Sequence, residues 1–113
     1  MDGTLGVQIF LSRLKPLLEA GKLVFQPRNR RKTWEFMLAE GLTAEDAYEI
    51  IAHLKCEHHH RGPEDDHDGT PGAVCSFKYP YKSIFLYIKI KIVIGETGDS
   101  GAVLSFHDEG NYE

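Results

Sequence analysis

The segment 87–94 alternates between isoleucine and polar residues over most of its length, and its polar residues are the first candidates for chemistry. Successive side chains of a β-strand point to opposite faces of a sheet, so Tyr87, Lys89 and Lys91 are expected to share one face. The isoleucines share the other face with Leu86 and can be buried in a core. A phenol and two ammonium groups, spaced about 7 Å apart on a rigid strand, are suited to binding phosphate.

A second alternating segment, residues 102–107, would add an imidazole to this face. Leu104 and Phe106 form its apolar side, so Ser105 and His107 are expected to point the other way. If the two strands pair with their apolar sides together, the imidazole lies beside the phenol and the lysines. Such a set could hold a phosphodiester and cleave it, because imidazole exchanges protons near neutral pH. The plain alternative is a solvent-exposed face on which lysines only increase solubility.

Residues 55–73 are polar and rich in turn-forming residues, and they are predicted to form a long loop. His59 or His60, together with Arg61, is expected to face the lysine-bearing surface, to transfer a proton and to grip a phosphate. The same histidines raise the alternative of a metal-dependent hydrolase. We expect neither a metal nor a small-molecule cofactor, because adjacent histidines in an extended loop diverge and no His-x-x-x-His or Cys-x-x-Cys pair is present.

A basic run at residues 28–32 is the candidate contact for an RNA backbone. The chain has a net charge of −4, but residues 1–32 carry +5 and residues 33–73 carry −8. An acidic protein is a poor general binder of nucleic acids, whereas a local basic patch can position a single strand. Arg28, Arg30 and Arg31 of this run are therefore predicted to bind RNA, together with Lys91 of the alternating segment. A basic connector in front of a helix is the alternative interpretation of the run.

The apolar pattern predicts helices over residues 5–20, 32–40 and 44–54, and strands over residues 23–25, 74–78, 83–94 and 102–107. The third helix should begin with a capping box at residues 43–46. In the second helix, Trp34, Met37 and Leu38 are expected to face inward. This order predicts one α+β domain over residues 1–113, a small antiparallel sheet with the N-terminal helices packed on one face.

The sequence has no recognisable targeting pattern, and its two cysteines are typical of a reducing compartment. No apolar run reaches the length of a membrane span and no signal-peptide pattern is present, so we expect no membrane association and a cytoplasmic location. Cys56 and Cys75 match neither a disulfide framework nor a metal spacing, and both are expected to be reduced.

With these residues in view, the chain resembles the MqsR-family toxins of bacterial type II toxin–antitoxin systems, which are small ribonucleases with a RelE-like fold. The likeness covers residues 10–109. It rests on the order and spacing of six short segments: residues 10–15 (FLSRLK), 21–22 (GK), 41–46 (GLTAED), 61–65 (RGPED), 87–91 (YIKIK) and 105–107 (SFH). Family members often carry Asp-Tyr where His58 and His59 stand, and a tryptophan near the position of Cys75.

The resemblance implies metal-independent, sequence-biased cleavage of mRNA, leaving 2′,3′-cyclic phosphate and 5′-hydroxyl ends, and neutralisation by a cognate antitoxin protein. The family's functional positions fall on His59, His60 or Arg61, on Tyr87 and Lys89, and on His107. The rival hypothesis is a non-catalytic binding module or inhibitor, encoded by a mobile element, that uses the acidic region to contact a basic partner. An acidic side chain neutralising Lys89 would favour that rival.

Overall fold

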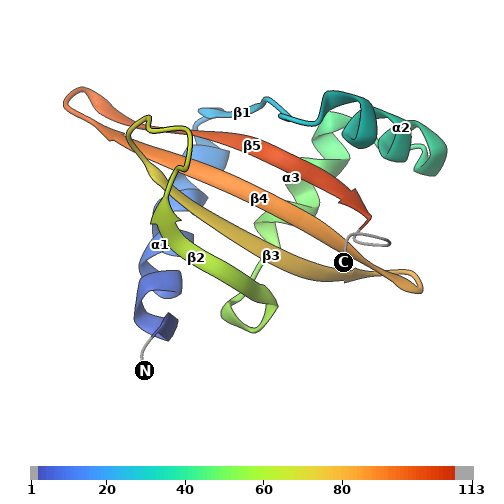
Figure 1. Ribbon diagram of the computed structural model, residues 1–113, viewed down its shortest axis with the longest axis horizontal. Helices are drawn as coiled ribbons and strands as arrows, with labels where there is room; N and C mark the ends of the chain where they lie inside the picture. Colours follow the sequence, from blue (N-terminus) through green and yellow to red (C-terminus); the bar gives the residue numbers. More distant parts are fainter. Residues whose placement is uncertain (1–2, 109–113) are drawn as a thin grey trace.

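A five-stranded sheet in the order β1-β5-β4-β3-β2 organises the computed structural model, which describes residues 3–108 (Figure 1). Only β1 and β5 run parallel, and every other neighbouring pair is antiparallel. Along the chain the elements are α1 (Gly3–Glu19), β1 (Leu23–Phe25), α2 (Arg30–Glu40), α3 (Ala44–Ala52), the 3₁₀ turn η1 (Cys56–His58), β2 (His59–Asp65), β3 (Ala73–Tyr81), β4 (Ile84–Gly95) and β5 (Gly98–Asp108).

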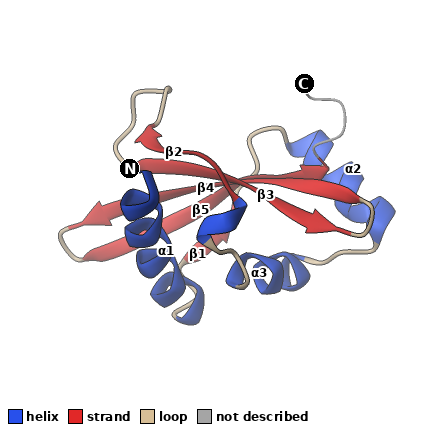
Figure 2. Cartoon of the chain, turned by 90° about the horizontal axis from the view of Figure 1, so that it is seen from below, coloured by secondary structure: helices blue, strands red, loops and turns tan. Residues whose placement is uncertain are grey.

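The α+β prediction is confirmed, because α1 and α3 cover one face of the sheet (Figure 2). The helix α2 lies at the β1 and β5 edge, and the face opposite α1 and α3 is called the helix-free face. The core lies between these helices and the sheet, where apolar side chains from both layers are buried. It includes Val7, Phe10, Leu14 and Leu17 of α1, Ala47 and Ile51 of α3, and Phe77, Leu86, Ile88, Ile90, Ile92, Val103 and Phe106 of the strands. Burying each large side chain stabilises the fold by about 1.5–3 kcal/mol. None of the helices within residues 3–108 has the length and apolar character needed to cross a membrane.

Local sequence explains where the second and third helices begin. The predicted capping box is present at α3, where the Asp46 amide donates to the Thr43 hydroxyl and the Thr43 amide donates to the Asp46 carboxylate, at 3.1 and 2.9 Å. The side chain of Asn29 caps α2 in a similar way, by accepting from the Lys32 amide at 3.2 Å. Gly41 then ends α2 in the left-handed conformation.

The predicted inner face of α2 is wrong in two of its three positions. Met37 is buried, but Leu38 is 84% exposed and Trp34 is 43% exposed. The buried stripe instead joins Met37 to Thr33, four residues earlier and on the same helical face. Trp34 lies at the edge of this stripe, with its ring 5.3 Å from that of Phe25.

The predicted loop over residues 55–73 is also partly wrong, because it contains the turn η1 and the edge strand β2. Only residues 66–72 connect β2 to β3, and Figure 2 shows this connection on the side of the sheet opposite α1 and α3. An edge strand with no fully buried residue has no apolar alternation, so its sequence is typical of a loop.

The last strand contains a β-bulge, so the face predicted for Leu104 is wrong. Ile88 pairs with Phe106 and Ile90 pairs with Val103, which leaves Leu104 without a partner on β4. The extra residue reverses the alternation, so Val103 rather than Leu104 joins the core. Leu104 is buried on the helix-free face, where it lines a hollow together with residues of β1 and β4.

Candidate functional site

The helix-free face of the sheet brings together the three strand residues that the sequence singles out. Tyr87 on β4 is directly opposite His107 on β5, and Lys89 is opposite Ser105, one register step further along. The rings of Tyr87 and His107 are stacked, with centroids 5.7 Å apart and planes 29° apart. The bulge at Leu104 lies beyond Ser105, so it does not disturb this pairing.

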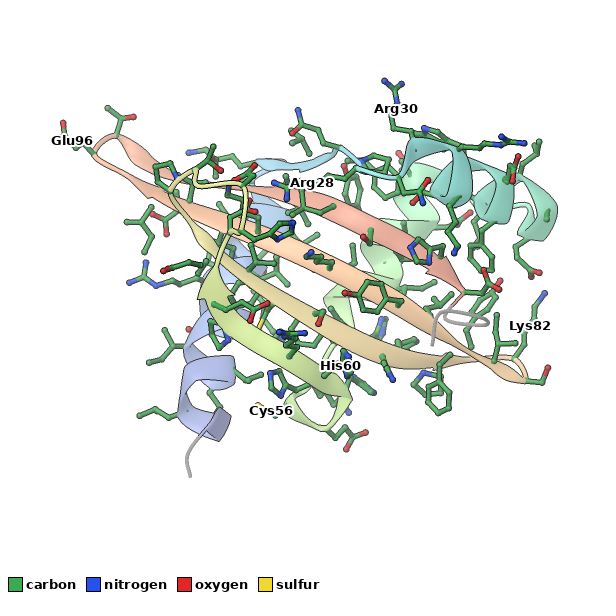
Figure 3. All side chains as sticks on the ribbon, in the orientation of Figure 1. Arg28, Arg30, Cys56, His60, Lys82 and Glu96 are labelled. Carbon is green, nitrogen blue, oxygen red and sulfur yellow. The ribbon has the colours of Figure 1, made fainter. Side chains whose placement is uncertain are left out.

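A hollow of about 390 Å³ lies on this face, over β2, β3 and β4. It gathers three predicted site residues, namely Arg61, Tyr87 and Lys89. Its other lining residues are Glu64, Asp65, His67, Val74 and Ser76. Figure 3 shows the side chains on this face, with His60 labelled near the β2 edge and Arg28 near the β1 and β5 edge.

Lys89 is the most available cation in the hollow. It is half-buried in a cross-strand row between Ser76 and Ser105. No carboxylate within residues 3–108 forms an ion pair with it. A partly buried ammonium that lacks an internal counter-charge attracts an anion from solution.

His107 is buried, and its environment favours the neutral ring. Its Nδ1 donates to the carbonyl of Asp108 at 3.0 Å, so the neutral tautomer carries its proton on Nδ1 and accepts at Nε2. Burial lowers the pKa of His107 below its usual value, although the hydrogen bond to this carbonyl acts in the opposite direction. The positive charge of Lys32 lowers the pKa further. A neutral imidazole is the form that removes a proton.

The backbone around Gly62 sets the position of Arg61. Gly62 has a φ of 94°, and a Cβ at this residue would lie 2.3 Å from the carbonyl oxygen of Val74. Only glycine allows β2 to approach β3 so closely here. Arg61 pairs with Ser76 between two register shifts, and its Nε donates to Glu64 at 3.3 Å. The Arg61 side chain is 70% exposed, so an incoming phosphate can compete with Glu64 for its guanidinium.

The two predicted loop histidines lie in different surroundings. One ring nitrogen of His59, Nε2, donates to the carbonyl of Gly62 at 2.7 Å, and the ring contacts the core residue Phe77. This places His59 in a structural role beside the turn. The ring of His60 instead meets the edge of Tyr87, at a centroid distance of 6.2 Å. His60 does not line the hollow, but it is the member of the pair that contacts one of the lining residues, Tyr87.

Two of the residues predicted to bind RNA are already engaged by one buried carboxylate. Asp66, whose side chain is 1% exposed, accepts two hydrogen bonds from Arg28 at 2.9 and 2.6 Å and one from Lys91 at 2.8 Å. Lys91 also donates to the hydroxyl of Thr70, and Arg28 to Asp68 at 3.1 Å. These bonds hold the pKa of Asp66 well below its usual range. Arg28 and Lys91 thus anchor the connection between β2 and β3.

The other two predicted RNA contacts lie at the start of α2, apart from the hollow. Arg30 is the first residue of the helix and is exposed. Arg31 forms an exposed ion pair with Glu35 at 3.0 Å, which is the i, i+4 spacing of a helix surface.

Two lining residues, Ser76 and His67, were missed in the sequence. The alternation of Val74, Ser76 and Lys78 in β3 is a signal that would have placed Ser76 on the same face as Lys89. No local pattern marks His67, because its position depends on Asp66, which binds partners 25 and 38 residues away. Within residues 3–108, no three histidine, cysteine or carboxylate side chains are grouped so that they could hold a metal ion.

A second, more apolar groove of about 420 Å³ lies between α1 and the strands β2, β3 and β4, with Ile9, Phe10, Pro63 and Ile92 among its lining residues. Its one ionisable side chain, Arg13, is bound to Asp99 at 3.1 Å. The ionisable side chains therefore gather in the hollow on the helix-free face, where Arg61, Glu64, Asp65, His67, Tyr87 and Lys89 line it. Comparisons with protein-family models, with curated proteins and with solved structures found no match to the chain.

Proposed function

We propose that this protein is a metal-independent endoribonuclease that cleaves single-stranded mRNA, and that it is the toxin of a toxin–antitoxin module. The observation that carries the proposal is the position of Lys89. It lies in a hollow with Arg61 and Tyr87, and it is two residues along β4 from Tyr87, the cross-strand partner of His107. No carboxylate of the described chain forms an ion pair with it. A scissile phosphate bound there meets two cations and stands near an imidazole.

The proposed reaction is an attack by the RNA on its own backbone. His107 takes the proton of a 2′-hydroxyl through Nε2, and the oxygen forms a bond to the adjacent phosphorus. The ammonium of Lys89 and the guanidinium of Arg61 stabilise the negative charge that develops on the phosphoryl oxygens. The bond to the 5′-oxygen then breaks, which leaves a 2′,3′-cyclic phosphate and, after protonation, a 5′-hydroxyl. The ring of Tyr87 can stack on a base next to the scissile phosphate.

The surroundings of the hollow are consistent with a single-stranded substrate. The aromatic rings of His60, Tyr87 and His107 follow one another across the sheet, with centroid distances of 6.2 and 5.7 Å. Such a row suits unstacked bases, which proteins bind on aromatic side chains. A substrate of mRNA places the protein in the cytoplasm, and its cognate antitoxin would neutralise it there.

The direct test compares the wild type with Lys89→Ala and with a matched lysine variant, Lys15→Ala. Lys15 is exposed on α1, the helix on the opposite side of the sheet. The proposal expects the wild type to arrest growth on expression and to cut a single-stranded transcript. Lys89→Ala should lose both effects and Lys15→Ala should keep both. A harmless wild type that leaves single-stranded RNA uncut would reject the proposal.

The alternative is a binding module on the same fold, and one observation favours it. Glu64 and Asp65 line the hollow beside Arg61, and Glu64 is close enough to form an ion pair with it. This mixture of charges fits a protein partner as well as it fits RNA. A stable complex with a protein partner that survives Lys89→Ala, without any RNA cleavage, would favour the alternative.

A further inference from the structure

The short connection between β2 and β3, residues 66–72, is anchored at its first residue. Asp66 is buried against Arg28, which precedes α2, and against Lys91 on β4. Asp68 accepts from the amide and the hydroxyl of Thr70 at 2.9 and 2.6 Å, which fixes the following turn. Arg28 and Lys91 thus hold the connection against the helix-free face through Asp66. This fixes the backbone position of the next residue.

That residue is His67, which lines the hollow together with Lys89 and Arg61. Its side chain is 79% exposed, and its Nδ1 lies 4.0 Å from a carboxylate oxygen of Asp66. This distance is too long for a hydrogen bond, so the exposed ring can turn either nitrogen towards a substrate in the hollow. His67 is the one histidine within residues 3–108 that lines this hollow.

The contacts of β4 place the two imidazoles on opposite sides of Lys89 along the strand. His107 pairs with Tyr87, two residues before Lys89, whereas Asp66 binds Lys91, two residues after it. Tyr87 and Lys91 are four residues apart on one strand, a separation of about 13 Å. A phosphate bound at Lys89 would lie between them. In-line displacement at phosphorus requires its base and its acid on opposite sides of the phosphate, because the entering and leaving oxygens are opposed.

We propose that His67 is the acid that protonates the leaving 5′-oxygen, an inference that rests on the ribonuclease function proposed above. In this step the bond between the 2′-oxygen and phosphorus forms while the bond between phosphorus and the 5′-oxygen breaks. The proton of the 2′-hydroxyl passes to Nε2 of His107, and a proton of the His67 imidazolium passes to the 5′-oxygen. The ion pairs of Asp66 have the role of positioning this acid.

The test uses a substrate whose leaving group needs no acid. The cleavage step of the wild type is first mapped on a defined single-stranded transcript. The same short sequence is then made with an ordinary 5′-oxygen and with a bridging 5′-sulfur, which leaves as a thiolate without protonation. His67→Ala and His67→Gln should cut the ordinary RNA about 10²–10⁴ times more slowly than the wild type. Both variants should cut the sulfur-containing RNA at close to the wild-type rate.

The matched control is His53→Ala, because His53 is an exposed histidine at the end of α3 and donates to the carbonyl of Glu49 at 2.8 Å. It should cut both substrates like the wild type. Equal losses on both substrates for the His67 variants would reject the role as acid, and so would an unchanged rate on ordinary RNA. If the wild type cuts neither substrate, it is the ribonuclease proposal that fails.

Discussion

The ring of Tyr87 stacks on the imidazole of His107, with centroids 5.7 Å apart and planes 29° apart. The two residues are directly opposite each other on β4 and β5, so the register of the hairpin fixes the contact. The stack restricts how the buried imidazole can turn. Tyr87 also lines the hollow, across from the residues of β2. Tyr87 therefore supports the proposed base and also offers an aromatic surface to the substrate.

Substitutions of Tyr87 should separate its ring from its hydroxyl. Tyr87→Phe keeps the stack on His107 and should retain most of the cleavage activity. Tyr87→Ala removes the stack and a base platform, and since base–aromatic stacking is worth about 1–3 kcal/mol, kcat/KM should fall by about 10–100-fold. Measuring kcat/KM of both variants on the same RNA checks this. Equal damage in the two variants would assign the main role to the hydroxyl.

Cleavage should depend on pH through His107. Burial lowers the pKa of this imidazole below its ordinary value of 6.5, so the neutral, proton-accepting ring persists into mildly acidic solution. The rise of kcat/KM with pH should therefore have its lower inflection below pH 6.5. A pH–rate profile with that inflection at or above the ordinary value would contradict the assignment of His107 as the base.

The same group should make folding stability depend on pH. Because its folded pKa is lower than its unfolded pKa, the unfolded chain binds more protons in the interval between the two values. Stability should therefore fall as the pH is lowered from about 6.5 towards the folded pKa. Urea unfolding midpoints should fall less steeply in this interval for His107→Asn than for the wild type. Parallel curves would show that His107 is not buried in its neutral form.

Asp66→Asn should destabilise the protein and displace the connection that carries His67. The substitution leaves Arg28 and Lys91 without their buried counter-charge, whereas the matched variant Asp99→Asn breaks only the more exposed pair with Arg13. The urea midpoint should thus fall more for Asp66→Asn. Because the folded pKa of Asp66 is depressed, its contribution is present above the unfolded pKa of 3.8 and is lost as the pH falls through the folded value. Equal midpoints for the two variants would show that the Asp66 pairs add nothing.

Gly62→Ala should disrupt β2 more than Gly69→Ala disrupts its turn. Both glycines have positive φ angles, 94° and 87°, so alanine is strained at each by roughly 1–2 kcal/mol. A Cβ at Gly62 would also collide with the Val74 carbonyl at 2.3 Å, whereas nothing lies within 4 Å at Gly69. Circular dichroism melts should show the larger loss for Gly62→Ala, and cleavage should fall with it because Arg61 is displaced. Similar losses in the two variants would contradict the close approach of β2 to β3.

The alternation in β4 was enough to predict the layer arrangement and the shared face of Tyr87 and Lys89. The position of His107 on that face was also predictable, because the bulge at Leu104 lies outside the paired residues 105–107. The bulge itself leaves no signal in an apolar strand, so Leu104 was assigned to the wrong face. The edge strand β2 and the engagement of Arg28 and Lys91 by Asp66 depend on long-range contacts, which a local pattern does not encode.

The most direct measurement of the central claim is the chemistry of the RNA ends. Purified wild type is incubated with a single-stranded transcript in excess chelator, beside Lys89→Ala and His107→Ala at the same concentration. The proposed mechanism predicts cleavage by the wild type alone, with 2′,3′-cyclic phosphate on one fragment and 5′-hydroxyl on the other. Cleavage that stops in chelator and returns with a divalent metal, or 5′-phosphate ends, would contradict the mechanism. Equal cleavage by all three proteins would show that the helix-free face is not the active site.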